Sequence, residues 1–570
     1  MVKIKYNHKS IWFLYGMLFG AVCFLLIYGV KVLDFTNDSW IMLAKDQDIK
    51  QHYLGWCHFR KAPWSFPFGL TKSLSNPYYM SVIYTDSIPL FAVFFKIFSW
   101  ALPDTFQYMG LFGIVSFALT GGISAVLIRR LTDKKILAIV APIVFVVSPV
   151  MLFRMFYHTS LSSQWIVLCC IYYMLDGFYN RSMYEQRKIC LYAGALCVGI
   201  HIYFLPIVAG FIFMSAVEKM LDEQTILNPL WMMIKNLFCF GLSAFCTMFA
   251  LGAFIEKTGN ENYAVGDFGA NLNTFINPLG MSKYIGDMPL YNDFQVEGSA
   301  YLGLGMLALL VVSIGLLIFN LGKNKGHISI KALSKYPMIT AIVLLCICFA
   351  TFATSPVFTI GAKKLIIFSY PKKLQIILGI FRSNGRFIWP VFYFIYIGIF
   401  KIISGMKKYA VCVVVIILGI VLQFADLSDY IKQTHERMAV SSEEYSNLWD
   451  LRVGDKLDGY KHFVLFSDSI IIYQNVGYYA YENGMDMNRF YFARDIDKQI
   501  EEQLDEHRRE LENGVMRDNT VYVMTEDDYK LYKDCGLYFY PLKYMVFGTN
   551  KRIDGLKEVS SDDLIQMGWN

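Results

Sequence analysis

Runs of about 20 apolar residues, separated by short polar stretches, recur along the first three quarters of this chain. A helix needs a run of this length to cross the hydrocarbon core of a bilayer. The pattern therefore predicts a polytopic α-helical membrane protein with about eleven transmembrane helices. The predicted spans are 11–30, 106–128, 136–151, 159–176, 189–204, 205–221, 231–254, 299–320, 336–353, 386–403 and 409–425.

Two apolar segments depart from this regular pattern. The first, Ile88 to Leu102, is short for a span. We expect it to form a helix at the outer interface, anchored by Trp100, with the Lys96 side chain reaching water. The second, 189–221, is tight for two crossings and is broken at 201–206. We expect a short hairpin there that leaves His201 in an outward-facing cavity.

After about residue 430 the pattern becomes that of a soluble α/β domain. Residues 463–466 and 520–524 read as buried strands, and 497–512 read as a charged helix. We expect two domains. Residues 1–430 form the transmembrane domain, whose outer loop 31–105 carries juxtamembrane helices, and residues 431–570 form an extracytoplasmic domain.

Composition and charge support this reading. The 570 residues are 55% hydrophobic with a mean hydropathy of +0.40, which excludes an ordinary soluble globule. The net charge of +6 is no sign of nucleic-acid binding, because the positive residues lie in short loops between spans, where they set topology. Lys3, Lys5 and Lys9 place the N-terminus in the cytoplasm. The loops expected outside are 31–105, 152–158, 255–298 and 354–385.

The twelve cysteines suggest neither disulfides nor zinc. All except Cys57 and Cys535 fall in apolar spans, and no paired spacing typical of a metal site occurs. We read them as small buried hydrophobic residues.

The first candidate site lies in the first outer loop. If 45–60 is helical, Asp48 and His52 share one face at positions i and i+4, and the carboxylate could act as a general base. Asp46 and Asp86 are further candidates. The simpler readings are a solvated loop charge for Asp46 and a helix cap, from Asp86 or Ser87, for the segment that follows. Trp56 and Trp64 could stack on sugar rings or belong to an interfacial belt.

The second candidate site is cationic. Arg382 and Arg386 offer forked donors to a phosphate, or else anchor lipid headgroups, and Lys372 lies upstream. Arg154 and His158, also at i and i+4, could bind the same anion or brace the loop. Glu297 is a lone outer carboxylate whose simpler role is to pair with one of these cations.

A carboxylate base and several cations at an outer cavity favour one chemistry. A lipid-linked phosphate would leave while the carboxylate activates an acceptor hydroxyl, and the arginines would stabilise the charge on the phosphate. The chain has no glycine-rich phosphate loop and no nucleophile elbow. An outward-facing site also has no supply of nucleotide sugars or ATP.

These features resemble the GT-C superfamily of polyprenyl-phosphate-dependent glycosyltransferases. More closely, the chain resembles a bacterial membrane-protein family that carries a domain of unknown function and is grouped with GT-C enzymes. The likeness covers roughly 11–427. Two departures are the mixed charge of Lys45, Gln47 and Lys50, and Asn384 where a small residue is expected. The motifs that carry the likeness are Asp48-Ile49-Lys50-Gln51-His52-Tyr53-Leu54-Gly55-Trp56, Phe59-Arg60, Pro63-Trp64-Ser65-Phe66-Pro67, Tyr84-Thr85-Asp86-Ser87-Ile88-Pro89-Leu90 and Ser383-Asn384-Gly385-Arg386-Phe387.

The resemblance implies inverting transfer of a sugar from a polyprenyl phosphate to an acceptor in the cell envelope, at the bacterial cell membrane. Asp48 would be the base, with Asp46 and Asp86 as further catalytic candidates. These three aspartates could also hold a divalent cation, which some GT-C enzymes use. The implied partners are the lipid-linked sugar, a glycan or glycolipid acceptor and membrane lipids. The residues assigned to the acceptor or sugar are His52, Trp56, Trp64, His158, His201 and Glu297.

Two other functions stay open. A carrier or flippase for lipid-linked saccharides should show ionisable groups at mid-membrane and internal repeats. The predicted spans are nearly free of charge and show no convincing repeat, which favours surface chemistry. The other alternative is a non-catalytic scaffold for envelope assembly whose tail binds partners.

Overall fold

The computed structural model describes residues 9–45, 47–259, 266–323, 336–494, 496–543 and 545–567. They divide into two units, and each is built from distant segments of the chain. The helical unit comprises Met1–Asp34, Tyr108–Phe245 and Asn262–Ala439. The mixed unit comprises Phe35–Gln107, Cys246–Glu261 and Val440–Asn570. The predicted domain boundary at residue 430 stays a prediction.

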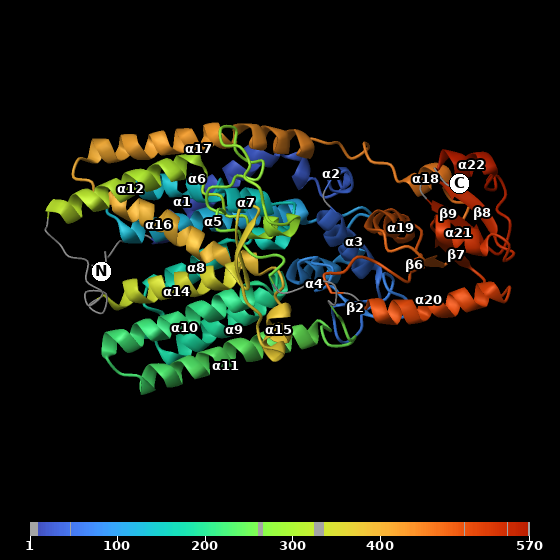
Figure 1. The fold of residues 1–570 in the computed structure, drawn as a ribbon, viewed down its shortest axis with the longest axis horizontal. Helices are drawn as coiled ribbons and strands as arrows, with labels where there is room; N and C mark the ends of the chain where they lie inside the picture. Colours follow the sequence, from blue (N-terminus) through green and yellow to red (C-terminus); the bar gives the residue numbers. More distant parts are fainter. Residues whose placement is uncertain are drawn as a thin grey trace. The chain divides into compact units, whose positions relative to one another are not determined.

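The helical unit consists almost entirely of helices that coincide with the apolar runs, with α12 lying along α17 and α10 along α14 (Figure 1). Its helices are α1 (Lys9–Tyr28), α5 (Met109–Leu131), α6 (Lys135–Val146), α7 (Pro149–Arg154), α8 (Trp165–Leu175), α9 (Met183–Ile200), α10 (Phe204–Glu223), α11 (Leu227–Ala250), α12 (Leu304–Lys323), α14 (Pro337–Thr354), α15 (Lys372–Gly379), α16 (Trp389–Ser404) and α17 (Tyr409–Met438).

Eight helical segments are long and apolar enough to cross a membrane, and two shorter apolar helices, Thr159–Leu175 and Leu304–Asn320, accompany them in the described part of the chain. Helices of this kind indicate a membrane protein. The mostly helical architecture is thus confirmed, whereas the count of eleven crossings and their orientation stay predictions.

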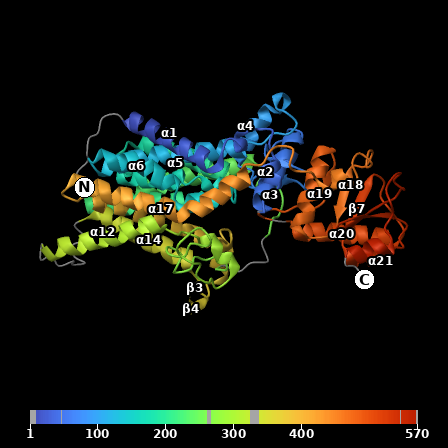
Figure 2. The ribbon, with the colours of Figure 1, turned by 90° about the horizontal axis from the view of Figure 1, so that it is seen from above.

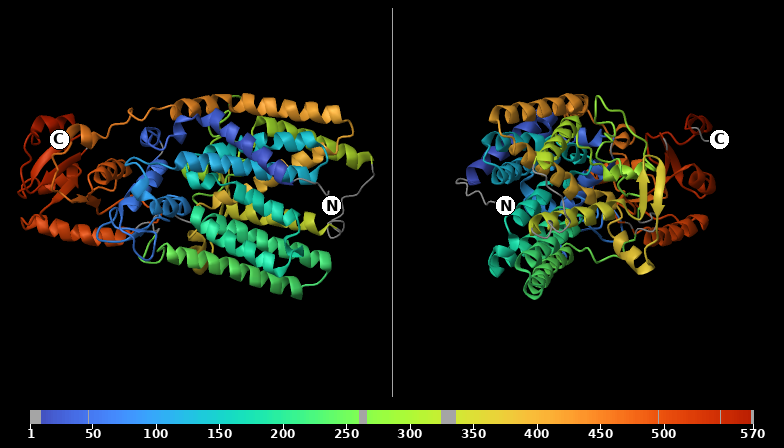
Figure 3. Two further views of the ribbon diagram at one scale, coloured as in Figure 1. Left: turned by 180° about the vertical axis from the view of Figure 1, so that it is seen from behind. Right: turned by 60° about the vertical axis from the view of Figure 1, so that its left-hand side comes forward.

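Small residues bring α1 and α5 into backbone contact, which lets α1 lie over α5 and α6 (Figure 3, left). A Cβ atom added to Gly16 would lie 2.3 Å from the Gly121 carbonyl oxygen, and one added to Gly20 would lie 2.2 Å from that of Phe117. Close approach at glycine is a common way for membrane helices to associate, because apolar burial gives no net driving force in lipid.

Between α14 and α16 the chain leaves the bundle. It forms an antiparallel hairpin of β3 (Val357–Ile360) and β4 (Lys363–Ile367), followed by α15. Figure 2 shows this hairpin projecting from the helices α12 and α14.

The mixed unit combines first-loop helices with an α/β tail. The first loop carries α2 (Ser39–Met42), α3 (Gln47–Lys61), a small β1–β2 ladder (Leu70–Thr71 with Met80–Ser81) and α4 (Pro89–Ile97). The tail has a five-stranded sheet in the order β6-β5-β7-β9-β8. Strand β5 is parallel to β6 and β7, and β9 is antiparallel to β7 and β8. The α/β prediction for the tail is therefore confirmed.

The predicted strands and helix of the tail fall where expected. They are β5 (His462–Leu465), β7 (Thr520–Met524) and α20 (Asp497–Glu512). Three further strands were not predicted: β6 (Asp486–Met487), β8 (Tyr538–Leu542) and β9 (Met545–Thr549). The remaining helices of the tail are α18 (Leu448–Arg452), α19 (Ile470–Glu482), α21 (Glu526–Tyr532) and α22 (Ser561–Gln566).

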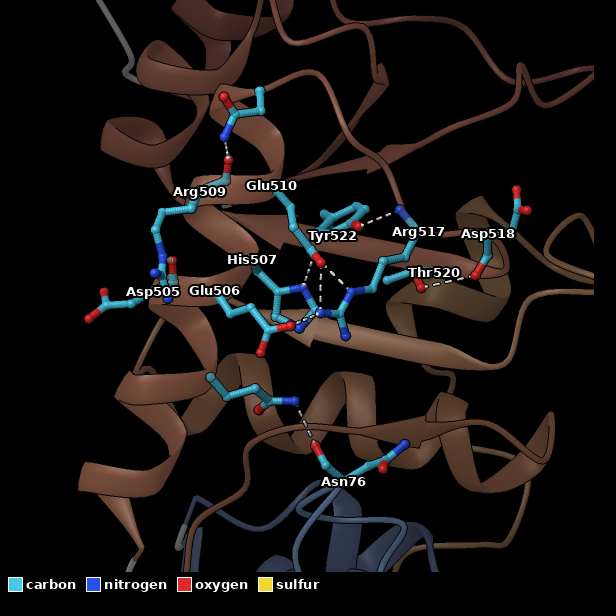
Figure 4. A network of polar contacts seen from close by, with 12 residues as sticks. Asn76, Asp505, Glu506, His507, Arg509, Glu510, Arg517, Asp518, Thr520 and Tyr522 are labelled. Carbon is cyan, nitrogen blue, oxygen red and sulfur yellow. Dashed lines mark hydrogen bonds and ion pairs between the residues drawn. The ribbon is translucent and has the colours of Figure 1, made fainter.

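A charged network fixes α20 beside the start of β7 (Figure 4). The Arg517 guanidinium donates to Glu510 from Nε (2.8 Å) and to Glu506 from Nη2 (2.7 Å), and its backbone N–H donates to the Tyr522 hydroxyl. The Arg517 guanidinium thus binds two carboxylates from successive turns of α20, so this network has a structural role.

The segment 88–102 forms α4 and a short 3-10 turn, as predicted. The prediction that Lys96 reaches water is wrong. Its side chain is 3% exposed, and its Nζ lies 3.9 Å from the Phe59 ring centroid and 4.8 Å from that of Trp64. The attraction between an ammonium and aromatic faces accounts for this inward position. The apolar side chains Phe94, Ile97 and Trp100 are exposed instead.

Candidate functional site

In the mixed unit, a buried carboxylate fixes the helix α3. Asp38 Oδ2 accepts hydrogen bonds from the hydroxyls of Tyr53 on α3 (2.9 Å) and Tyr478 on α19 (3.0 Å). Burial raises the pKa of Asp38, and the two donated hydrogen bonds oppose that shift. No sequence pattern predicts this anchor, because it joins residues 440 positions apart.

Asp48 lies in the first turn of α3, where the helix dipole favours a negative charge. Its side chain is half-buried, whereas His52, one turn later, is fully buried. The predicted helix over 45–60 is thus present, as Gln47–Lys61. On this helix the Asp48 side chain is more exposed than the His52 imidazole. Asp46 lies outside the described residues.

The turn 84–88 packs directly against α3. A Cβ atom added to Gly55 would lie 2.3 Å from Cβ of Thr85, so only glycine fits at this contact. The Ser87 hydroxyl donates to the His52 carbonyl (2.7 Å). The contact brings the turn that carries Asp86 against the face of α3 one to two turns after Asp48.

The backbone of this turn is strained. Asp86 and Ile88 have φ values of 51° and 53°, in the left-handed region that a β-branched residue rarely adopts. Such a conformation costs on the order of 1–3 kcal/mol and persists where surrounding contacts impose it, often at functional sites. The N-cap residue of α4 is Ile88, which makes no side-chain cap, and the Ser87 hydroxyl donates to the His52 carbonyl.

The two tryptophans of the first loop differ in exposure. Trp56 is fully buried and donates its indole N–H to the Phe106 carbonyl (2.9 Å), so its ring belongs to the core. Trp64 is 51% exposed and lies beside the Lys96 ammonium. The aromatic surface open to a ligand is therefore that of Trp64.

In the helical unit, one carboxylate joins two arginines. Glu297 Oε2 accepts from Arg154 Nη1 (2.9 Å) and from Arg386 Nε (2.7 Å), and the Glu297 carbonyl accepts from Arg154 Nη2 (2.6 Å). His158 Nε2 lies 3.9 Å from Glu297 Oε1. Burial alone would raise the pKa of Glu297, but the two guanidiniums hold it well below its usual range. We call these four residues the arginine cluster.

Local chemistry explains why Arg386 meets Glu297. Asn384 Nδ2 donates to the carbonyls of Phe352 (2.9 Å) and Ser355 (2.6 Å), which fixes the turn on the C-terminal end of α14. A Cβ atom added to Gly385 would lie 2.7 Å from Cα of Gly298, so the two backbones touch. Asn384, a departure from the expected pattern, thus has a structural role.

Tyr203, which was not among the predicted site residues, connects His201 with the arginine cluster. Its hydroxyl accepts from the Ser383 backbone N–H (2.9 Å), and its ring centroid lies 4.5 Å from the Arg386 guanidinium carbon. His201 is buried and its Nδ1 accepts from the Tyr203 N–H (3.1 Å). The sequence signal that could have pointed to Tyr203 is its position in the break between α9 and α10.

The remaining cations lie near this turn in sequence. Arg382 is half-buried, with its guanidinium 5.6 Å from the Phe268 ring centroid. Lys372 is exposed at the first residue of α15. Within the described ranges, no three His, Cys, Asp or Glu side chains gather closely enough to hold a metal ion. The divalent cation stays a prediction. Asp48 and Asp86 alone do not supply a complete set of ligands for it.

A family described as "Domain of unknown function (DUF6311)" matches residues 17–428, and its "DUF6311 C-terminal domain" matches residues 454–546. The chain belongs to the DUF6311 family. The first DUF6311 match includes every candidate site residue named above, and the second includes Tyr478, which fixes α3 through Asp38.

No curated protein matches this DUF6311 chain. Among solved structures, it is similar to the crystal structure of the Archaeoglobus fulgidus oligosaccharyltransferase in the apo form, with 10% identity and a TM-score of 0.41. That comparison covers 99% of this chain and 78% of the archaeal chain.

Proposed function

We propose that this protein is a GT-C-type membrane glycosyltransferase. It moves a sugar from a polyprenyl-phosphate donor to a hydroxyl of an extracytoplasmic cell-envelope acceptor, in the bacterial cell membrane with the N-terminus in the cytoplasm. The observation that carries the proposal is Asp48, a half-buried carboxylate at the start of a rigidly held helix, beside a strained turn that bears a second carboxylate, Asp86.

The proposed reaction is a single displacement. Asp48 accepts the proton of the acceptor hydroxyl, and the oxygen attacks the anomeric carbon opposite the phosphate. The bond between the anomeric carbon and the phosphate oxygen breaks, and its electron pair leaves with the polyprenyl phosphate. One displacement inverts the anomeric centre. Asp86 is the alternative base.

The cations have separate proposed roles. Arg382, which is half-buried, donates to the leaving phosphate. Arg386 is oriented by Glu297 and Tyr203, and it adds positive potential because one carboxylate offsets only one of two guanidiniums. Arg154 is fully buried and bound to Glu297 twice, so it positions Glu297 rather than contacting the phosphate.

The test is sugar transfer by the purified full-length protein. Radiolabelled polyprenyl-phosphate hexoses serve as donors and a membrane extract as the source of acceptors. We expect Asp48→Asn to lower the rate by about 10²- to 10⁴-fold, the usual contribution of a general base, without a change in melting temperature. Asp104→Asn, at an exposed aspartate of the same unit, is the matched control and should keep the parent rate.

Each other outcome redirects the proposal. A full rate in Asp48→Asn with loss in Asp86→Asn would move the base to Asp86. A full rate in both variants would exclude this carboxylate pair as the base. Tight donor binding by the parent protein without turnover of any donor would favour the carrier.

A further inference from the structure

Strand β4 is exposed along its whole length, although three of its five residues are large and apolar. All five residues are exposed, and Leu365, Ile366 and Ile367 retain 54%, 60% and 58% of their accessible surface. Successive side chains point to opposite faces of a strand, so both faces of β4 are uncovered. Large apolar side chains left exposed on both faces of a strand mark an interaction surface.

The hairpin is nevertheless held firmly, because β3 anchors it to the helical unit. Thr359 is fully buried, its hydroxyl accepts from Gln295 Nε2 (2.8 Å) and its carbonyl accepts from the Leu272 N–H (3.0 Å). At the tip, Asn271 donates to the Gly361 carbonyl (2.8 Å) and accepts from the Gly361 N–H (3.0 Å). These contacts fix β3 and leave β4 presented outward.

The charge of this region has one sign. Residues 355–386 contain no aspartate or glutamate, whereas Lys363, Lys364, Lys372 and Lys373 lie on β4 and at the start of α15. Helix α15 adds a strongly exposed apolar side chain, Ile376, at 74%. We call β4 and α15 together the lysine patch. Its partner must present apolar surface and negative charge together.

We infer that the lysine patch lies on the surface of the bilayer and binds the anionic headgroups of membrane lipids. The segment leaves one candidate span at Thr354 and enters the next at Asn384, so both of its ends are at the level where spans end. An open strand edge cannot enter the hydrocarbon, because its backbone groups would lack partners there. Exposed apolar side chains that adjoin lysines along the chain suit the interface, where anionic lipids attract the ammonium groups.

This inference is independent of the proposed function, since it concerns lipid contact and not sugar transfer. It extends the alternative of a headgroup anchor from the arginines to Lys372 and its neighbours. It commits to the bilayer as the source of the phosphates. A second copy of the chain, which could pair with the β4 edge, is an outcome that the test separates.

The test is hydrogen exchange of the full-length protein in lipid nanodiscs. One set contains phosphatidylcholine alone, and the other contains about 30% phosphatidylglycerol. We expect amides of residues 363–379 to exchange about tenfold more slowly in the anionic discs. The variant with Lys363, Lys364, Lys372 and Lys373 each changed to Gln should lose this difference. The matched control, Lys530→Gln on α21 with Lys533→Gln directly after that helix, should keep it.

Several results would overturn the inference. They are equal exchange in the two kinds of disc, protection that persists in the four-lysine variant, and protection that appears only with two protein copies per disc. If exchange in α14 or α16 shows that the variant is misfolded, the parent protein in about 0.5 M salt replaces it. Salt at that concentration screens exposed charges and should remove the protection; protection that survives salt would contradict the inference.

Discussion

The arginine cluster of the helical unit and the surroundings of α3 in the mixed unit are both buried and polar, but different interactions hold them. The arginine cluster is held by charge, since one carboxylate bridges two guanidiniums at 2.7 and 2.9 Å. Helix α3 is held by hydrogen bonds, among them the one from Tyr53 to the buried Asp38 carboxylate, and by close fit. His58 bridges Ser73 and the Gly477 carbonyl, and Gly55 touches Thr85.

The difference shows two ways of fixing a reactive group. Charge pairing orients Arg386 and leaves a net positive charge in place, which suits the binding of an anion. Contacts farther along α3 fix that helix, and Asp48 at its start is half-buried rather than fully buried. The two arrangements should therefore respond differently to loss of charge, to acid and to added volume.

Removing the charge of Glu297 should have the largest effect on stability. Glu297→Gln leaves two buried guanidiniums without a counter-charge, and loss of one partner of a buried ion pair costs about 3–5 kcal/mol. Because the folded pKa of Glu297 is held below its unfolded value, this stabilisation is complete at neutral pH and is lost only as pH falls through the folded pKa. Denaturant unfolding between pH 5 and 8 should show a constant deficit.

The control for that prediction is Asp429→Asn in the same unit. Asp429 pairs with Lys283 at 3.0 Å, but its side chain is 55% exposed, so its loss should cost less than about 1 kcal/mol. Equal losses in the two variants would contradict the view that charge holds the arginine cluster.

Acid should disturb the mixed unit through His58. Burial lowers the pKa of His58 to about 4, whereas in the unfolded chain it is about 6.5. The folded state therefore binds fewer protons between these values, and stability falls as pH drops through this window, by about 3 kcal/mol in total. Thermal unfolding from pH 7 to pH 4 should show this decline.

His58→Gln cannot take up the proton, so its stability should be lower at pH 7 and flatter toward pH 4. A decline as steep as that of the parent protein would assign the acid sensitivity to other groups.

Added volume at Gly55 tests the close fit and should have the smallest effect of the three. Gly55→Ala places a methyl group against Thr85 and Ser87, and overpacking of this kind costs about 1–3 kcal/mol. Gly241→Ala is the matched helical control, because nothing lies within 4 Å of the added Cβ. It should be neutral or stabilising by less than about 1 kcal/mol. Similar melting temperatures for both variants would show that close packing at Gly55 does not stabilise α3.

Local pattern was enough to predict many elements. Length and hydropathy gave the apolar helices, and periodicity gave α3, α20, β5 and β7, because these signals lie within one segment. The short strand β6 and the hairpin β3–β4 escaped prediction. β6 has two residues, and β4 is apolar on both faces without being buried, so neither shows the alternation of a half-buried strand.

The candidate site was predictable by residue type and, in part, by pairing: the simpler role expected of Glu297, to pair with one of the cations, is present with both Arg154 and Arg386. The sequence singled out Arg154, Glu297 and Arg386 one by one. Their joint contact depends on the close packing of Gly298 against Gly385 and on the hydrogen bond from Asn384 to the end of α14. Asp38 and Tyr478 were missed because no local pattern relates residues 440 positions apart. The roles proposed for Asp48 and the cations stay predictions.

The bond between Asp38 and Tyr478 also sets an order of events during synthesis. A ribosome adding about 5–20 residues per second needs roughly 20–90 s to travel from one residue to the other. Throughout that interval the first-loop helix lacks its last anchor. A chain that stops early carries Asp48 without the contacts that fix it, so we expect only finished molecules to be competent.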